Sequence, residues 1–290
     1  MTIYLDGDYV KLDDAKISVF DHGLLYGDGI FEGIRVYNDR IFKLDEHIQR
    51  FFEGAKAIML DLPLGFDEIA EMIIETCRRN QVHDGYIRLV ATRGMGDLGI
   101  SPSKCEKPTI FCIAGTISVY PEEMYKSGIS VITAQQRRNN STILDTQIKS
   151  LNYLNNILAR IEANHAGVHE AIMLSQNGVV AECTVANIFI VKEGIFYTPP
   201  TYCGALDGIT RRTVIELARE AGFELQEKEF TLYNVYNADE CFLTGTGAEC
   251  IAVTSADRRV IGAGVAGPIT EQILTLYRNY VRSNGTEIYV

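Results

Sequence analysis

The chain contains 290 residues, of which 47% are hydrophobic, so it can bury the core of one large domain or of two modest ones. Its formal net charge is −11 and no run of basic residues occurs, which argues against nucleic acid as a partner. The N-terminus lacks the basic and apolar regions of a signal peptide, and no later segment has about 18 consecutive apolar residues. We therefore expect a soluble cytoplasmic protein that does not associate with membranes.

The cysteine and histidine patterns predict neither disulfides nor a metal site. The seven cysteines form no Cys-x-x-Cys pair, so reduced thiols are expected. His165 and His169 have the spacing of helical metal ligands, but Gly167 lies between them and no glutamate completes a zinc motif. We expect no bound metal.

In chain order, the first part of the sequence alternates predicted strands with two amphipathic helices. Asp6 and Gly7, within IYLDGDYV, are typical of a hairpin turn. Apolar residues recur at helical spacing from Leu44 to Ile58 and again from Asp67 to Asn80. The remaining predicted elements of this part are strands at 85–94 and 108–116 and a glycine-rich loop at 94–102.

The stretch GTISVYPEEMYKSG, between Gly115 and Gly128, is the best candidate for a domain boundary, because it holds a proline and charges between two glycines. We place one domain at 1–120 and a second at 121–290. The elements predicted for the second domain are strands at 129–134, 170–174, 179–183, 186–191 and 240–244, helices at 151–166 and 210–221, and a turn at Asn177-Gly178. This order lacks strict strand-helix alternation, which favours an α+β fold over a doubly wound sheet.

Lys149 is the first candidate for chemistry. It stands in TQIKSLNYL, just before the predicted helix 151–166, for which Ser150 is a plausible N-cap. The predicted buried stripe of this helix is Leu151, Leu154, Leu158 and Ile161. A helix start disfavours a neighbouring ammonium, and a lysine with a lowered pKa is a nucleophile that can form a Schiff base with pyridoxal phosphate. The alternative is an ordinary solvated lysine.

Pyridoxal phosphate also needs a carboxylate for its ring nitrogen and donors for its phosphate. Glu182, in VVAECTVANIF, lies among apolar residues where an unpaired carboxylate would be costly, unless it faces water at a strand end. The amides of Ile209 and Thr210, with Thr210 as the N-cap of the helix 210–221, could bind phosphate, although capping alone also explains this pattern. Thr246, in the turn LTGTGAE, could add a further anion-binding group.

Arg50 lies beside the apolar stripe of its predicted helix and could reach an anion, or simply face solvent. The strand period of two places Phe31, Gly33 and Arg35 on one face of YGDGIFEGIRVY. The same period places Tyr86 and Arg88 together. These faces would combine apolar groups with groups that bind carboxylates, although either strand could instead expose its polar side to water.

Seven motifs in chain order resemble the branched-chain aminotransferases, which are fold-type-IV pyridoxal-phosphate enzymes. They are YGDGIFEGIR, LDEHIQRF, GYIRL, IKSLNYL, AECTVANIF, LDGITR and TGTGAE, and they cover nearly the whole chain. The resemblance implies that Lys149 carries pyridoxal 5'-phosphate, that Tyr153 hydrogen-bonds its phenolic oxygen and that Glu182 pairs with its ring nitrogen. The residues that it assigns to the phosphate are Arg50, Ile209, Thr210 and Thr246, and it assigns Leu206 to the ring face.

The resemblance also implies a substrate site. It places the α-carboxylate of an amino acid on backbone amides near Thr246, Gly247 and Ala248, with help from Tyr86. Arg88 and Tyr26 would receive the side-chain carboxylate of glutamate. The apolar pocket for leucine, isoleucine or valine would be lined by Phe31, Gly33, Tyr153, Leu98 and Ile100, with Arg35 on the same face.

The implied fold is the α+β, D-amino acid aminotransferase-like fold of fold type IV, in which the cofactor lies between a small N-terminal α/β domain and a larger C-terminal domain. The implied assembly is a homodimer. The implied reaction is transamination between branched-chain L-amino acids and 2-oxoglutarate, giving branched-chain 2-oxo acids and L-glutamate. The Gly27–Gly29 motif is shared with D-amino acid aminotransferases and aminodeoxychorismate lyases, but FEGIR and the lack of an Arg-x-His in the loop after Gly94 favour the branched-chain enzymes. An (R)-amine transaminase is a further alternative.

Overall fold

A computed structural model describes residues 1–116 and 120–289, which divide into two compact units. The N-terminal unit comprises residues 1–116, 148–152 and 281–289, and the C-terminal unit comprises residues 120–147 and 153–280. The predicted boundary after residue 120 adjoins residues 117–119, which lie outside the described residues, so it stays a prediction. The segments 148–152 and 281–289, which the sequence assigned to the second domain, group with the N-terminal unit.

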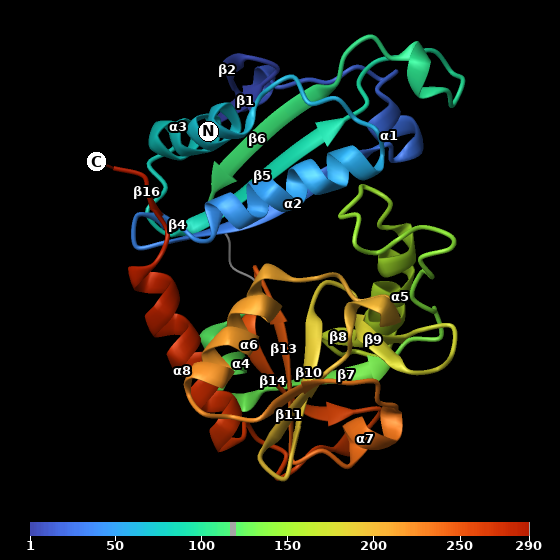
Figure 1. The fold of residues 1–290 in the computed structure, drawn as a ribbon, viewed down its shortest axis with the longest axis vertical. Coiled ribbons are helices and arrows are strands. Elements are labelled where there is room, and N and C mark those ends of the chain that lie inside the picture. Colours follow the sequence, from blue (N-terminus) through green and yellow to red (C-terminus); the bar gives the residue numbers. More distant parts are fainter. Residues whose placement is uncertain (117–119, 290) are drawn as a thin grey trace. The chain divides into compact units, whose positions relative to one another are not determined.

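The described residues of the N-terminal unit form a seven-stranded antiparallel sheet with the strand order β16-β4-β3-β5-β6-β1-β2 (Figure 1). Its strands are β1 (Thr2–Leu5), β2 (Asp8–Lys11), β3 (Gly29–Tyr37), β4 (Arg40–Ile41), β5 (Gly85–Thr92), β6 (Thr109–Gly115) and β16 (Thr286–Glu287). The predicted hairpin at Asp6-Gly7 is confirmed, and both residues have positive φ angles, as this tight turn requires. The strand β3 is the longest of the sheet and carries most of the candidate residues of this unit.

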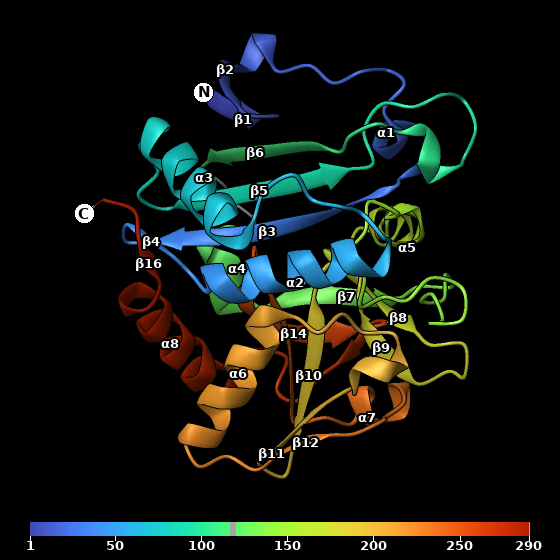
Figure 2. The same cartoon turned by 45° about the horizontal axis from the view of Figure 1, so that its top comes forward.

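Two helices, α2 (Leu44–Ala57) and α3 (Phe66–Arg79), cover the same face of this sheet (Figure 2). Both confirm the predicted helices, and their apolar stripes are buried as the helical spacing indicated. The stripe residues pack against Ile34, Ile87 and Leu89 of the central strands. The other helical segments of the unit are short: α1 (His22–Tyr26) and two turns of 3-10 helix at Leu12–Asp14 and Pro102–Lys104. The opposite face of the sheet is therefore left for other groups.

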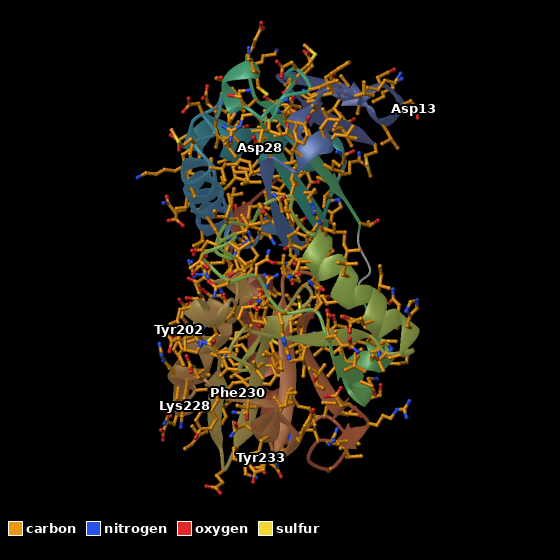
Figure 3. All side chains as sticks on the ribbon, turned by 90° about the vertical axis from the view of Figure 1, so that its right-hand side faces the viewer. Asp13, Asp28, Tyr202, Lys228, Phe230 and Tyr233 are labelled. Atoms are coloured by element: carbon orange, nitrogen blue, oxygen red, sulfur yellow. The ribbon has the colours of Figure 1, made fainter. Side chains whose placement is uncertain are left out.

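Within residues 120–280, the C-terminal unit contains a nine-stranded mixed sheet, and most of its strand pairs are antiparallel. Its strands are β7 (Ile129–Thr133), β8 (Glu170–Leu174), β9 (Val180–Cys183), β10 (Asn187–Lys192), β11 (Ile195–Thr198), β12 (Leu225–Glu227), β13 (Glu240–Gly245), β14 (Glu249–Ala256) and β15 (Arg259–Val260). Phe230, labelled in Figure 3, belongs to the core of this unit, and its carbonyl accepts a hydrogen bond from the start of β9. Helices and mostly antiparallel strands together confirm the predicted α+β class.

The helices of the C-terminal part are α4 (Glu122–Ser127), α5 (Leu154–His165), α6 (Ile209–Glu220), α7 (Leu232–Tyr236) and α8 (Pro268–Ser283), with a 3-10 turn at Thr201–Cys203. The sequence did not predict α8 or β14. The predicted buried stripe of α5 is wrong, because Leu154, Leu158 and Ile161 are 67%, 43% and 42% exposed. Small residues, Ala159 and Ala163, pack inward instead, since they let the helix approach β8 closely.

None of the described helices is both long enough and apolar enough to cross a membrane. All seven cysteines are free thiols, as predicted. Among the described residues, the histidines, cysteines and carboxylates form no cluster that could hold a metal ion.

Candidate active site

Lys149 lies on an extended segment that pairs with the free edge of β3. The amide of Phe31 donates to the Lys149 carbonyl at 3.0 Å, and the amide of Leu151 donates to the Gly29 carbonyl at 2.9 Å. Asn152 secures the end of the segment, because its side-chain amide donates to the Gly27 carbonyl at 2.8 Å. These hydrogen bonds fix the backbone of the lysine to the start of β3.

The expected position of Lys149 at the mouth of a helix is therefore wrong. The helix α5 begins at Leu154, its N-cap is Tyr153, and Ser150 forms an isolated bridge with Ile30 rather than capping a helix. The backbone groups of residues 149–151 are satisfied by β3, which removes the reason for a helix to start there. The helix dipole cannot be the cause of any unusual reactivity of Lys149.

The face of the sheet opposite α2 and α3 carries an aromatic and cationic cluster around Lys149. Its Nζ lies 4.3 Å from the ring centroid of Phe31, and the guanidinium of Arg88 lies 4.6 Å from the same centroid. Arg88 also donates to the Tyr86 hydroxyl at 3.0 Å. Two cations on one aromatic ring form a polarised surface that can attract a carboxylate while the ring contacts apolar groups.

Gly33 allows this cluster to form. It pairs with Arg88 across β3 and β5, and the Tyr86 hydroxyl would lie only 2.0 Å from a Cβ atom added at Gly33. Any side chain there would displace the tyrosine. Arg35, opposite Tyr86 in the register, extends the same face, and its guanidinium lies 4.8 Å from the Tyr37 ring centroid. The period of two thus correctly grouped these residues.

Tyr26 contacts the loop that follows β5. Its hydroxyl donates to the Leu98 carbonyl at 2.5 Å, and a ring nitrogen of His22, one turn earlier on α1, is 2.9 Å from the Asp97 carbonyl. Leu98 and Ile100 are mostly exposed on this loop. The structure therefore places Tyr26 as a contact of the loop that bears these two predicted pocket residues.

Arg50 belongs to a buried ionic cluster that the sequence did not predict. Its Nε and Nη2 atoms each donate to the Glu32 carboxylate at 2.8 Å, and Nδ1 of His47 donates to the same carboxylate at 2.7 Å. Burial alone would raise the pKa of Glu32, but Arg50 and His47 outweigh it and lower this pKa well below its usual range. Burial lowers the pKa of His47, so Glu32 is an anion beside a neutral histidine.

A second ion pair anchors the start of β3. The guanidinium of Arg93 donates to both carboxylate oxygens of Asp28, labelled in Figure 3, at 2.9 and 3.0 Å. The same guanidinium donates to the carbonyls of Ile58 and Met59 at 2.6 Å each. This bidentate pair ties the segment before β3 to the end of α2.

Glu182 is the central acid of the C-terminal unit. It lies on β9 and is 4% exposed, and one of its oxygens accepts from the Leu206 amide at 3.0 Å and from the Asn187 side chain at 3.1 Å. Its other oxygen is 2.5 Å from Nη2 of Arg138. The carboxylate is therefore buried, paired and held in one orientation, rather than exposed at a strand end.

The helix α6 begins one residue earlier than predicted, with Gly208 as its N-cap in place of Thr210. A Cβ atom at Gly208 would lie 2.1 Å from the Asn187 side chain, so the close approach of this turn to β10 requires glycine. Ile209 and Thr210 are the first two helical residues, whose amides have no partner within a helix. Thr246, Gly247 and Ala248 form the turn between β13 and β14. Both places present backbone amides that suit an anion.

The predicted residues thus fall into two groups. Those of the N-terminal unit are Tyr26, Phe31, Gly33, Arg35, Arg50, Tyr86, Arg88, Leu98, Ile100 and Lys149, and those of the C-terminal unit are Tyr153, Glu182, Leu206, Ile209, Thr210, Thr246, Gly247 and Ala248. The polar partners that the sequence missed are Glu32, His47, Arg138 and Asn187. A charged residue on the apolar face of a predicted strand, such as Glu32 between Ile30 and Ile34, is the signal that could have found one of them.

Comparison with known proteins gives one consistent family. Residues 29–256 match the family described as amino-transferase class IV. A protein of Methanocaldococcus jannaschii that is provisionally named a branched-chain-amino-acid aminotransferase is 50% identical over 289 residues, covering 100% of this chain and 99% of that protein.

Solved structures agree with the sequence match. The branched-chain amino acid aminotransferase of Escherichia coli has a TM-score of 0.95 and 32% identity, covering 99% of this chain and 96% of that one. Another branched-chain amino acid aminotransferase, from the organism abbreviated T.th. and complexed with N-(5'-phosphopyridoxyl)-L-glutamate, has a TM-score of 0.92 and 36% identity, covering 97% of this chain and 94% of that one.

Proposed function

This chain belongs to the amino-transferase class IV family, and on that premise we propose that it transfers the amino group of leucine, isoleucine or valine to 2-oxoglutarate. One observation carries the proposal. Lys149 shares the ring of Phe31 with Arg88 on a sheet face that also bears Gly33 and Tyr86, so an amine adjoins a surface suited to both aliphatic and carboxylate side chains. A transaminase that alternates between leucine and glutamate needs both properties in one pocket.

The donor set fits pyridoxal 5'-phosphate, the cofactor that we propose. Lys149 offers an amine for its aldehyde, and Glu182 is a buried carboxylate whose charge is already balanced by fixed donors, as a partner for a protonated ring nitrogen should be. A relative of the same fold is complexed with the phosphopyridoxyl derivative of glutamate. The proposed phosphate ligands are Arg50, Ile209, Thr210 and Thr246, with Tyr153 at the phenolic oxygen and Leu206 against the ring.

When bound, this cofactor supplies an electron sink that stabilises negative charge on the substrate α-carbon. Lys149 attaches the cofactor through Nζ, and the same amine is the base that moves the proton from the α-carbon. Glu182 holds a proton on the ring nitrogen by accepting a hydrogen bond from it. Glu32 holds Arg50 in one orientation, so that its charge is directed before the phosphate arrives.

The substrate contacts follow the same assignment. Gly247 and Ala248, with Tyr86, would bind the α-carboxylate through amides and a hydroxyl. Arg88 and Tyr26 would receive the distal carboxylate of glutamate. The apolar pocket residues are Phe31, Gly33, Tyr153, Leu98 and Ile100, with Arg35 at its rim.

We also propose that the protein is a homodimer that works in the cytoplasm. The helix α5 presents Leu154, Ile157, Leu158 and Ile161 as an exposed apolar stripe, which is typical of a surface that a partner covers. Light scattering should give twice the mass of one chain. Leu158→Lys should shift the mass toward one chain, because a charge would have to be buried.

An absorption spectrum of the purified, cofactor-loaded protein tests the proposed reaction. Addition of L-leucine should bleach the visible absorption of the cofactor, and 2-oxoglutarate should restore it. D-alanine, an (R)-amine and aminodeoxychorismate are the matched controls for the alternative members of this fold. Bleaching by one of these and not by L-leucine would replace the branched-chain assignment.

A further inference from the structure

Arg138 is a buried arginine with no role in the reaction described so far. It is 7% exposed and its Nη2 atom lies 2.5 Å from the Glu182 carboxylate. It follows β7 at the end of AQQRRNN, a stretch that the sequence motifs did not include. Its neighbour Arg137 is exposed, so the two adjacent arginines differ sharply in environment.

The guanidinium of Arg138 is fixed from several sides. Its Nη1 atom donates to the Asn156 side chain at 2.8 Å, and its Nε atom donates to the Gly204 carbonyl at 3.0 Å. Asn156 is held in turn, because its side-chain amide donates to the Thr184 carbonyl at 2.6 Å. The planar fork of arginine is therefore bound at each of its three nitrogen atoms, and it can present only one orientation to Glu182.

Glu182 receives its other donors on the opposite oxygen, from the Leu206 amide and from Asn187. Without Arg138, one buried carboxylate oxygen would lose a charged partner, and burial disfavours the charged form of a carboxylate. A neutral Glu182 could no longer balance a protonated ring nitrogen. The cation that keeps the acid ionised is thus as necessary as the acid.

We propose that Arg138 is a positioning residue that keeps Glu182 ionised and correctly oriented for the ring nitrogen of the cofactor. This inference rests on the proposed function, because it needs Glu182 to meet that nitrogen. Its chemistry requires the fork of arginine, since a lysine restores the charge but not the three-sided anchoring to Asn156 and Gly204.

The test combines cofactor binding with a double-mutant cycle. The variants are Arg138→Met, Arg138→Lys, Glu182→Gln and the double variant Arg138→Met with Glu182→Gln, and Arg137→Met is the exposed control. Pyridoxal 5'-phosphate is titrated into each apoprotein by absorbance, kcat and KM for L-leucine are measured, and circular dichroism confirms that each variant is folded.

Loss of a partner that orients a contact residue commonly costs about 10–100-fold, and we expect Arg138→Met to weaken cofactor affinity and lower kcat within that range while KM changes little. Arg138→Lys should recover part of the loss, and Arg137→Met should match the wild type. In the Glu182→Gln background, Arg138→Met should add less than about threefold, because the two residues act as one unit.

Additive losses in the cycle would show that Arg138 only supports the fold, and an unchanged affinity and kcat in Arg138→Met would also overturn the inference. If Arg138→Met fails to fold, the comparison of Arg138→Lys alone and with Glu182→Gln decides by the same criterion. Failure of the wild type to bind the cofactor or to turn over L-leucine would instead reject the proposed function.

Discussion

Replacing Glu32 by glutamine should destabilise the N-terminal unit more than other substitutions at acidic residues of its helices and strands. The Glu32 carboxylate accepts three hydrogen bonds of 2.7 to 2.8 Å from Arg50 and His47, and all three side chains are buried. Glutamine has nearly the same shape, but its amide presents N–H groups where donors already converge. Arg50 would keep a buried charge without its counter-ion.

Breaking a buried ion pair by neutralising one partner costs about 3–5 kcal/mol, a large share of the 5–15 kcal/mol, roughly, that keeps a domain folded. With a slope of about 3 kcal/mol per molar urea, the unfolding midpoint should fall by about 1 M or more. Urea unfolding followed by circular dichroism measures this shift. Glu53→Gln is the matched control, since Glu53 is an exposed residue of α2, and we expect it to change stability by less than about 0.5 kcal/mol.

The same substitution should weaken the binding of pyridoxal 5'-phosphate, because Arg50 would lose the partner that orients it. A loss of stability below about 1 kcal/mol in Glu32→Gln would refute the reasoning, since it would mean that the buried carboxylate is not ionised or not needed. A shift equal to that of Glu53→Gln would have the same meaning.

Three further predictions follow from the site. Gly33→Ala should leave the fold intact but push the Tyr86 hydroxyl away from its 2.0 Å overlap with the new methyl group, raising KM for amino acids about 10-fold in steady-state assays; an unchanged KM would contradict this. Acid should destabilise the protein in two steps: burial lowers the folded pKa of His47 below 6.5, so the unfolded chain takes up that proton first, and Arg50 and His47 overcome burial to lower the pKa of Glu32 below 4.5, so a second loss follows. Urea midpoints should fall below pH 6.5 and again below pH 4.5, and a flat midpoint from neutral pH to pH 5 would exclude the histidine step. Glu182→Gln should still bind the cofactor but lose about 100-fold or more in kcat, and near-normal turnover would disprove its role.

Local patterns predicted the regular elements well. The hairpin at Asp6-Gly7 and the helices α2 and α3 depend on turn residues and on apolar spacing that a few neighbouring positions specify. The strand period likewise grouped Phe31, Gly33 and Arg35 correctly, because alternate residues of a strand share a face whatever covers it. The family was predicted from motifs and is confirmed.

Features that depend on distant partners were not predictable in this way. Lys149 was expected at a helix start, but its backbone pairs with β3, far away in the sequence. The stripe on α5 was correctly recognised as apolar and wrongly assumed to be buried, because periodicity identifies a stripe and not its cover. The partners of Glu182 and Arg50 are side chains on other strands and loops, whose arrangement only the fold determines.

Borohydride reduction of the cofactor-loaded protein, followed by peptide mass mapping, tests the central assignment most directly. We predict that the reduced cofactor is fixed on the peptide that contains Lys149, and that Lys149→Ala abolishes both this label and the response to L-leucine. A label on another lysine, or turnover retained by Lys149→Ala, would contradict the assignment.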